Sequence, residues 1–149
     1  RAWLTTNEKG DPKAVVALAA DDAVISSQYM PTDTTGKKAL EKELSEAMKA
    51  FVDQKSTVAM CVAAGAVVAC EYEWKATFKG PAMGMKPTGK TGSVHSLEII
   101  EVKDGKVAKT TAYANGVEFA GTFGLMEGQA GQGAPKGDKP AKGGAPKKK

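Results

Sequence analysis

The sequence predicts an α+β fold in which a curved antiparallel sheet packs on two to three N-terminal helices. Apolar residues recur at helical spacing in the first third of the chain and with a period of two over most of the rest. Helices followed by a run of strands is the order typical of α+β domains. A sheet that curves over helices encloses a space between the layers, so an internal pocket is also predicted.

The chain divides into a folded domain over residues 1–126 and a tail over residues 127–149. The tail carries six lysines against Glu127 and Asp138, and none of its residues is more apolar than alanine. Because such a segment cannot bury enough surface to offset its ordering entropy, we expect it to be disordered. The net charge of +4 then belongs to the tail, and no specific binding of nucleic acid is expected.

Two further bounds concern membranes and the N-terminus. No window approaches the roughly 18 apolar residues of a membrane helix, so no transmembrane segment is predicted. The chain begins at Arg1, and we expect its N-terminus, and with it the first helix, to be truncated or processed. Cytoplasmic and exported locations both stay open.

Two short helices and one long helix are predicted. Residues 1–7 form the end of a first helix, and Asp11-Pro12 is the capping signal for a second over residues 12–20. The long helix follows Gly36, with an apolar face made of Ala39, Leu40, Leu44, Ala47, Met48, Phe51 and Val52. The opposite face is interpreted as solvent-exposed and carries Lys38, Glu41, Lys42, Glu43, Glu46 and Lys49.

Strands are expected from Ala23 toward Tyr29 and in two hairpins after the long helix. The hairpins turn at Ala64-Gly65 and at Asp104-Gly105, the second being the stronger turn signal. The last apolar segment, residues 117–126, is either a short helix or a terminal strand. Cys61 and Cys70 fall on the two strands of the first hairpin. The favoured interpretation is two buried free thiols, and the alternative is a cross-strand disulfide.

Several short stretches within residues 1–126 are each weak signals, but their shared order and spacing are specific for one superfamily. They are Gly10-Asp11, residues 18–24, residues 36–39, residues 78–81, residues 87–90, residues 104–107, Tyr113 and residues 123–125. In order and spacing they resemble the SnoaL-like polyketide cyclases, relatives of ketosteroid isomerase in the nuclear-transport-factor-2-like superfamily. The resemblance implies a cone-shaped α+β barrel, often dimeric, with a pocket inside. It does not define an activity, because this fold hosts enzymes and non-enzymes.

The catalytic positions of these relatives are only partly retained. The resemblance places the oxyanion tyrosine of ketosteroid isomerases at Trp3, their aspartate base at Ser27 and their protonated acid near Glu98. Only Glu98 keeps a carboxyl group, so a ketosteroid isomerase mechanism is not expected. Many cyclase-like members have an acidic residue where this chain has Asn115, whose amide can hold a carbonyl but cannot transfer protons.

Three residues are candidates for catalysis: Glu98, His95 and Asn115. His95 is the single histidine and the natural base near neutral pH. It alternates with Glu98 on the strand over residues 93–103, so only one of the two points inward unless a bulge intervenes. Because Ile100 shares the face of Glu98 and is expected in the core, we predict that Glu98 points inward, with a raised pKa, and that His95 points outward.

The candidates for binding a small hydrophobic molecule lie on the elements expected to line the pocket. They are Trp3, Ser27, Tyr29, Trp74, Phe78, Met83, Met85, Tyr113 and Phe119. For the aromatic residues the alternative is ordinary core packing, and for the two methionines it is anchoring of a loop instead of a lid over the ligand. Neither a metal-ligand pattern nor a phosphate-binding loop is present, so no metal and no cofactor are expected.

Two functions are compatible with these residues. The first is an enzyme that isomerises a small hydrophobic carbonyl compound or cyclises it by an intramolecular aldol reaction. In that enzyme Glu98 is the acid/base, and Tyr113, Asn115 and Ser27 hold oxygens. The second is a non-catalytic binding or dimerisation module. An open cavity with converging polar groups favours the enzyme, and a cavity filled by aromatic side chains favours the module.

A homodimer is expected with either function. The outer face of the sheet is moderately apolar and includes Val67, Ala69, Leu97 and Ile99. Exposed apolar patches of this kind often mark subunit contacts.

Overall fold

The computed structural model describes residues 1–28, 30 and 32–126. The tail predicted over residues 127–149 and the candidate ligand-binding residue Tyr29 lie outside the described residues. The elements are α1 (Ala2–Thr5), the 3₁₀ helix η1 (Thr6–Lys9), α2 (Pro12–Val16), β1 (Ala19–Ser27), β2 (Thr34–Thr35), α3 (Lys37–Ala50), β3 (Phe51–Ala64), β4 (Val67–Phe78), β5 (Thr91–Lys103), β6 (Lys106–Ala114) and α4 (Gly116–Thr122). None of the helices in the described part of the chain has the length and apolar character needed to cross a membrane.

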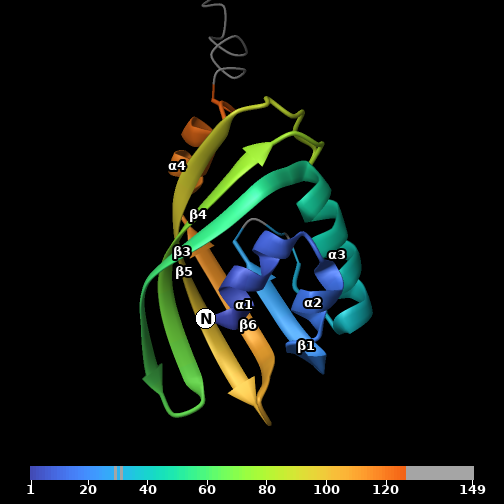
Figure 1. Cartoon of the computed structure of the whole chain (residues 1–149), viewed down its shortest axis with the longest axis vertical. Coiled ribbons are helices and arrows are strands. Elements are labelled where there is room, and N and C mark those ends of the chain that lie inside the picture. Colours follow the sequence, from blue (N-terminus) through green and yellow to red (C-terminus); the bar gives the residue numbers. More distant parts are fainter. Residues whose placement is uncertain (29, 31, 127–149) are drawn as a thin grey trace, which may run out of the picture.

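The six strands form one curved sheet, and α1, α2 and α3 lie within its concave side (Figure 1). The strand order is β2-β1-β6-β5-β4-β3, which confirms the predicted α+β class. One pairing departs from the antiparallel expectation, because β1 runs parallel to β6 with Ser26 opposite Thr111. The sheet is therefore mixed, since the long connection through α3 and β3–β5 returns the chain beside β1 in the same direction.

The second helix is shorter than its apolar spacing predicts. Asp11 caps it by accepting a hydrogen bond from Lys13 N at 2.9 Å, as expected. It ends at Val16, and the chain is already in strand β1 at Ala19, opposite Val107 on β6. Pairing within the sheet therefore overrides the helical pattern of residues 17–20.

The long helix also ends earlier than predicted. Phe51 has extended backbone angles of −115° and 108° and begins β3, where it pairs with Phe78 on β4. Its ring stacks on that of Phe78 at a centroid distance of 4.9 Å. The last apolar residues of the helical pattern therefore belong to the sheet and carry its core.

The β5–β6 turn and the last apolar segment complete the fold. The β5–β6 hairpin turns at Asp104-Gly105, whose φ angles of 50° and 72° are those of a tight hairpin turn. Residues 116–122 form a helix, α4, instead of a strand. Its N-cap is Asn115, whose Oδ1 accepts from the amides of Val117 and Glu118 at 3.0 and 3.2 Å.

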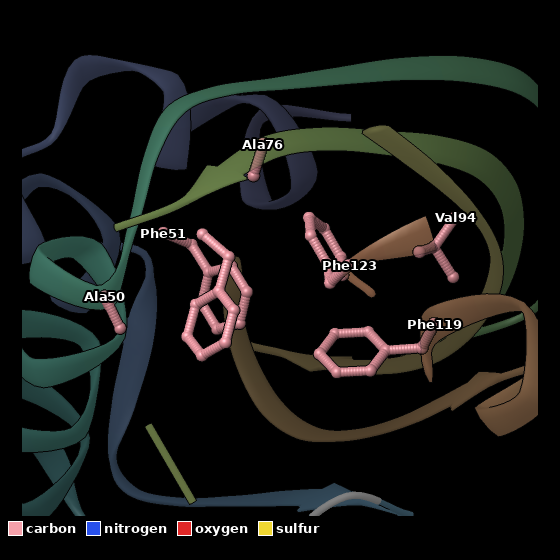
Figure 2. Close-up of a cluster of buried hydrophobic side chains, with 7 residues drawn as sticks. Ala50, Phe51, Ala76, Val94, Phe119 and Phe123 are labelled. Atoms are coloured by element: carbon pink, nitrogen blue, oxygen red, sulfur yellow. The ribbon is translucent and has the colours of Figure 1, made fainter. Parts of the chain in front are cut away.

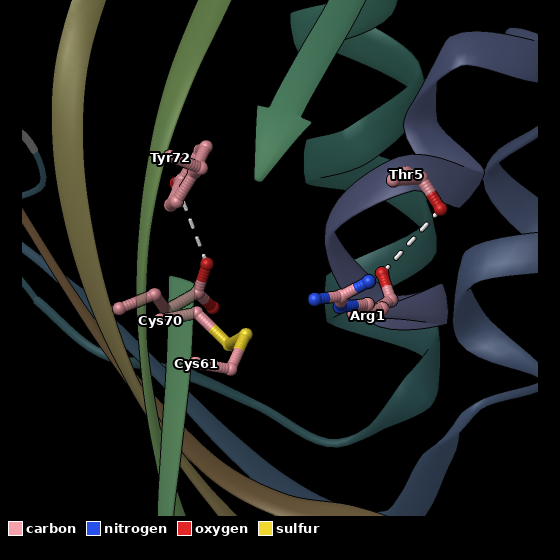
Figure 3. The surroundings of a disulfide bond; sticks show 6 residues. Arg1, Thr5, Cys61, Cys70 and Tyr72 are labelled. Carbon is pink, nitrogen blue, oxygen red and sulfur yellow. Dashed lines mark hydrogen bonds between the residues drawn. A yellow bond between two sulfur atoms is a disulfide. The ribbon is translucent and has the colours of Figure 1, made fainter. Parts of the chain in front are cut away.

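The two cysteines form a disulfide, so the favoured expectation of two free thiols was wrong. Cys61 and Cys70 lie directly opposite each other on β3 and β4, with 4.1 Å between their Cα atoms. Directly paired residues point to the same side of a sheet, which brings the two sulfurs together. Figure 3 shows the disulfide and Tyr72 on the side of β4 that faces the N-terminal residues.

A cluster of phenylalanines fills one end of the fold. Phe51, Phe119 and Phe123 face one another in Figure 2, with centroid distances of 5.4 Å from Phe51 to Phe123 and 5.0 Å from Phe119 to Phe123. Phe78 and Phe123 are fully buried. Because α4 and its C-cap residue Phe123 supply two of the four rings, the helix is packed tightly against this end of the sheet.

Candidate functional site

A cavity of about 290 Å³ lies between the concave face of the sheet and the helices. Most of its lining is apolar, which is the character of sites for small organic ligands. Polar side chains in the lining include those of Asn7, Ser27, Glu43, Gln54, Ser56, Tyr72, Ser96 and Glu98. The cavity is therefore open and carries several converging polar groups.

Glu98 is the most buried of the charged residues in this lining, with 7% of its surface exposed. Trp3 Nε1 donates a hydrogen bond to its Oε1 at 2.7 Å, and the Tyr72 hydroxyl donates to its Oε2 at 3.4 Å. Burial raises the pKa of Glu98, and hydrogen bonding offsets only part of that shift because it favours the ionised form. The carboxyl group is thus protonated at higher pH than an ordinary glutamic acid.

The strand alternation explains this position. Glu98 lies between Cys70 on β4 and Ala112 on β6, and it shares a face with the buried residues Val94 and Ile100. The strand register set by the Asp104-Gly105 turn predicts the same inward orientation for Glu98. Cys70 is fully buried and Ile100 is 4% exposed, so apolar groups keep water away from this part of the strand.

Two aromatic residues hold the carboxyl group. Trp3, predicted to bind ligand, reaches Glu98 from α1 and also lines the cavity. Tyr72 was not among the predicted site residues, although it occupies the same face of β4 as Trp74. That alternation was the signal that could have identified it, because Tyr72 and Trp74, two successive inward residues of β4, both line the cavity.

A second carboxyl group, Glu43, enters the cavity from α3. It is half-buried and accepts a hydrogen bond from the Thr34 hydroxyl of β2. Its assignment to the solvated face of the helix was therefore wrong. Glu43 lies three residues after the buried Leu40 and next to Leu44, a spacing that keeps it on the same side of the helix as the core.

Hydrogen bonds of side-chain and backbone amide groups fix another part of the cavity wall. Trp74 Nε1 donates to Gln54 Oε1 at 3.1 Å, and Gln54 Nε2 donates to the carbonyl oxygen of Phe51 at 2.9 Å. The backbone N–H of Ser56 donates to Glu8 Oε1 at 2.8 Å, which ties β3 to η1. Trp74 is thereby fixed as a wall of the cavity instead of a plug.

The other predicted ligand-binding residues divide into two groups. Ser27, Met83 and Phe119 line the cavity. Tyr113 borders it, but its side chain belongs to the outer face, because it pairs with Leu97 and is 46% exposed.

Phe78 and Met85 lie elsewhere. Phe78 is fully buried within the phenylalanine cluster, and Met85 packs against that cluster. For Phe78 the alternative of core packing therefore describes its position.

The structure does not bring the three catalytic candidates together. His95 is on the outer face, where its Nδ1 lies 2.7 Å from Glu118 Oε1 on α4. The hydrogen bond to Glu118 raises the pKa of His95. Asn115 is exposed and its Oδ1 caps α4. Only Glu98 of the three lines the cavity.

Comparisons with known proteins agree with this architecture. The family model of the SnoaL-like polyketide cyclases matches residues 1–123. AclR from Streptomyces galilaeus is 26% identical, with a TM-score of 0.66 over 83% of this chain and 88% of AclR. TsrD from Streptomyces laurentii is 17% identical, with a TM-score of 0.71 over 82% of this chain and 89% of TsrD.

A further solved structure has been described with a small ligand. It is a ketosteroid isomerase-like protein from Catenulispora acidiphila in complex with trimethylamine. That protein is 18% identical, with a TM-score of 0.68 over 83% of this chain and 86% of its own. None of the curated proteins matches the sequence. The family match over residues 1–123 shows that this chain belongs to the SnoaL-like polyketide cyclase family.

Proposed function

We propose that the cavity binds a small hydrophobic carbonyl compound and that Glu98 acts on it as a buried acid. The observation that carries the proposal is the position of Glu98, 7% exposed on the wall of an open cavity, with a pKa raised by burial. A carboxyl group kept protonated in this way donates a hydrogen bond to a substrate oxygen and supports charge that develops there.

Trp3 defines which oxygen of Glu98 carries the proton. Its indole N–H can only donate, so the Oε1 atom that it contacts at 2.7 Å must accept. This favours the proton of the neutral acid on Oε2, whose remaining lone pair still accepts from the Tyr72 hydroxyl at 3.4 Å. Trp3 is thus a positioning residue for the acid.

Glu43 supplies the base that this chemistry needs. Isomerisation and aldol cyclisation both begin when a C–H bond next to the carbonyl breaks. The proton goes to a base, and the electron pair forms an enol whose oxygen is stabilised by Glu98. Glu43 is the second carboxyl group in the lining. It then returns the proton at another carbon, or the enol carbon attacks a second carbonyl to close a ring.

The second candidate function is a non-catalytic binding or dimerisation module. It is supported by large apolar side chains exposed on the outer face of the sheet: Met60, Val62, Val67, Leu97 and Tyr113. The enzyme is the better-supported proposal, because the cavity is open and holds two carboxyl groups. Membership of a cyclase family agrees with it.

The two functions are separated by deuterium exchange. A panel of small cyclic ketones and diketones is first screened for binding by thermal shift, and the binders are then incubated with protein in D₂O. For the wild type we expect catalysed exchange of the hydrogens next to the carbonyl, followed by NMR. Glu98→Gln and Glu43→Gln should each lower that rate by about 10²-fold or more while binding persists.

The matched control is Glu118→Gln, since Glu118 is a carboxyl group outside the cavity lining. This variant should catalyse hydrogen–deuterium exchange of the ketone at the wild-type rate. Binding without exchange in the wild type would support the module instead. Exchange that survives in Glu98→Gln would show that Glu98 has only a structural role.

A further inference from the structure

A second hollow lies on the surface beside the cavity, between the Met83-Gly84 turn and α4. Its volume is about 330 Å³. We call it the α4 groove. Its lining contains no charged or hydrogen-bonding side chain and consists of Gly116, Met83, Met85, Phe119, Ala120, Leu125 and Met126. A surface hollow whose side chains are all apolar is better suited to hydrocarbon than to ions or sugars.

The α4 groove and the inner cavity share two walls, Met83 and Phe119. Phe119 is 7% exposed and stands between them. Met83 is 47% exposed and is the more mobile of the two by chemistry, because a methionine side chain is unbranched and adapts to its neighbours. A ligand in the cavity therefore meets a flexible side chain, and beyond it the groove.

The backbone under Met83 is held firmly. Ala82 and Met85 exchange hydrogen bonds of 2.8 and 3.3 Å across the turn. Met83 itself has a φ of 50°, a left-handed conformation that residues with a side chain adopt rarely. The turn thus presents the Met83 side chain at the junction of the two hollows.

We propose that the α4 groove binds the distal apolar part of the same ligand whose carbonyl group lies at Glu98. This inference rests on the proposed function, and it adds that the ligand is elongated, with an apolar extension away from its reactive carbonyl. Only the side chains of Met83 and Phe119 are common to both linings, so a long ligand would pass from one hollow to the other beside the flexible Met83 side chain. A peptide is a poorer occupant, because no side chain of the groove could satisfy its backbone N–H and C=O groups.

The test uses three methyl ketones, 2-butanone, 2-hexanone and 2-dodecanone, titrated into the full-length protein by calorimetry. Each methylene that is removed from water tightens binding by about fourfold. We expect the affinity to keep rising from 2-hexanone to 2-dodecanone in the wild type, because the longer chain extends past Phe119.

Two variants change the groove without changing the inner cavity. Met126→Asp places a charge at an exposed groove residue, and Ala120→Leu fills the groove from α4. Both should bind 2-hexanone like the wild type and lose at least tenfold in affinity for 2-dodecanone. Val117→Asp is the control, since Val117 is on the same helix, 70% exposed and outside the groove lining.

The outcomes separate this inference from the proposed function. If the short ketones bind and affinity stops rising at 2-hexanone, or the rise survives in both groove variants, the groove does not bind ligand and the proposed function stands. If no ketone binds, both are overturned. If the wild type self-associates and Met126→Asp alone abolishes this, the groove is a protein contact and the inference is wrong.

Discussion

Trp3 Nε1 donates a hydrogen bond to Glu98 Oε1 at 2.7 Å, and so joins the first helix to β5 across 95 positions of sequence. The helix itself has only four residues, too few to be stable alone. Leu4 beside it is 3% exposed and packs with Cys70 and Ile100. The contact therefore anchors the N-terminal segment and also determines which oxygen of Glu98 accepts a hydrogen bond.

Trp3→Phe tests the hydrogen bond directly. Without the indole donor, which favours the ionised carboxylate, the pKa of Glu98 should rise further above its ordinary value. Loss of a part-buried hydrogen bond should also destabilise the fold by about 1–3 kcal/mol. The pKa is measured by ¹³C NMR of glutamate-labelled protein. Trp74→Phe, which removes the bond to Gln54 instead, should leave the Glu98 titration unchanged.

Glu98→Gln should change how stability depends on pH. The folded-state pKa of Glu98 lies above the unfolded value, so the native state binds the proton more tightly. Its contribution is fully present below the unfolded pKa and is lost as the pH rises through the folded pKa. The glutamine of the variant does not ionise, so its folded state is not destabilised as the pH rises. The variant should therefore gain stability relative to the wild type between weakly acidic and neutral pH.

Urea unfolding at a series of pH values measures this difference. At pH 4 and below, where the acid is protonated in both states, the two proteins should agree within about 1 kcal/mol. Curves that stay parallel across the range would show that Glu98 is not a buried acid with a raised pKa.

The sequence predicts well whatever depends on alternation and turns. Glu98 and His95 are assigned to opposite faces because Ile100 and the Asp104-Gly105 turn set the register of the strand, and the structure has them so. A period of two needs no knowledge of distant partners. The same reasoning finds the inward face of β4.

The sequence predicts poorly whatever depends on partners from another element. Glu43 looks like a solvated helix charge until β2 supplies the Thr34 hydroxyl. Phe51 continues a helical pattern, but pairing with Phe78 draws it into β3. Asn115 carries a polar group after an aromatic residue, and the onset of α4 makes it an N-cap. In each case tertiary contacts override a local signal.

The pair of His95 and Glu118 should be visible in a pH titration. The hydrogen bond to Glu118 raises the pKa of His95, and the same bond lowers the pKa of Glu118. The pair thus contributes to stability above the pKa of Glu118, and that contribution is lost as the pH rises through the raised pKa of His95. In Glu118→Gln the His95 pKa should fall toward its ordinary value, as followed by the imidazole proton shifts. An unchanged titration would show that the pair does not persist in solution.

The disulfide should contribute measurably to stability. It closes a segment with a sequence separation of 9, for which the loss of chain entropy in the unfolded state is worth about 2–3 kcal/mol. Cys61→Ala combined with Cys70→Ala should lower the free energy of unfolding by about that amount, measured in urea. Reduced and oxidised wild type should differ similarly. Equal stability of the two redox forms would contradict the prediction.

The outer face of the sheet predicts self-association. Two cross-strand rows lie next to each other there: Val62, Ala69, Ile99 and Thr111 in one, and Met60, Glu71, Leu97 and Tyr113 in the other. Five of these eight side chains are large and apolar, and Met60, Val62, Leu97 and Tyr113 are between 42% and 59% exposed. Covering them with a second copy would remove apolar surface from water on both chains at once, as a two-fold symmetric contact requires.

Leu97→Lys places a charge in the middle of that face. We expect the wild type to sediment as a dimer at micromolar concentration and the variant as a monomer. The monomer itself should unfold within about 0.5 kcal/mol of the wild-type chain, because Leu97 is exposed there. Val117→Lys, which puts the same charge on an exposed residue of α4 outside the two rows, should leave the dimer intact. A wild type that stays monomeric at high micromolar concentration would assign these apolar rows to some other partner.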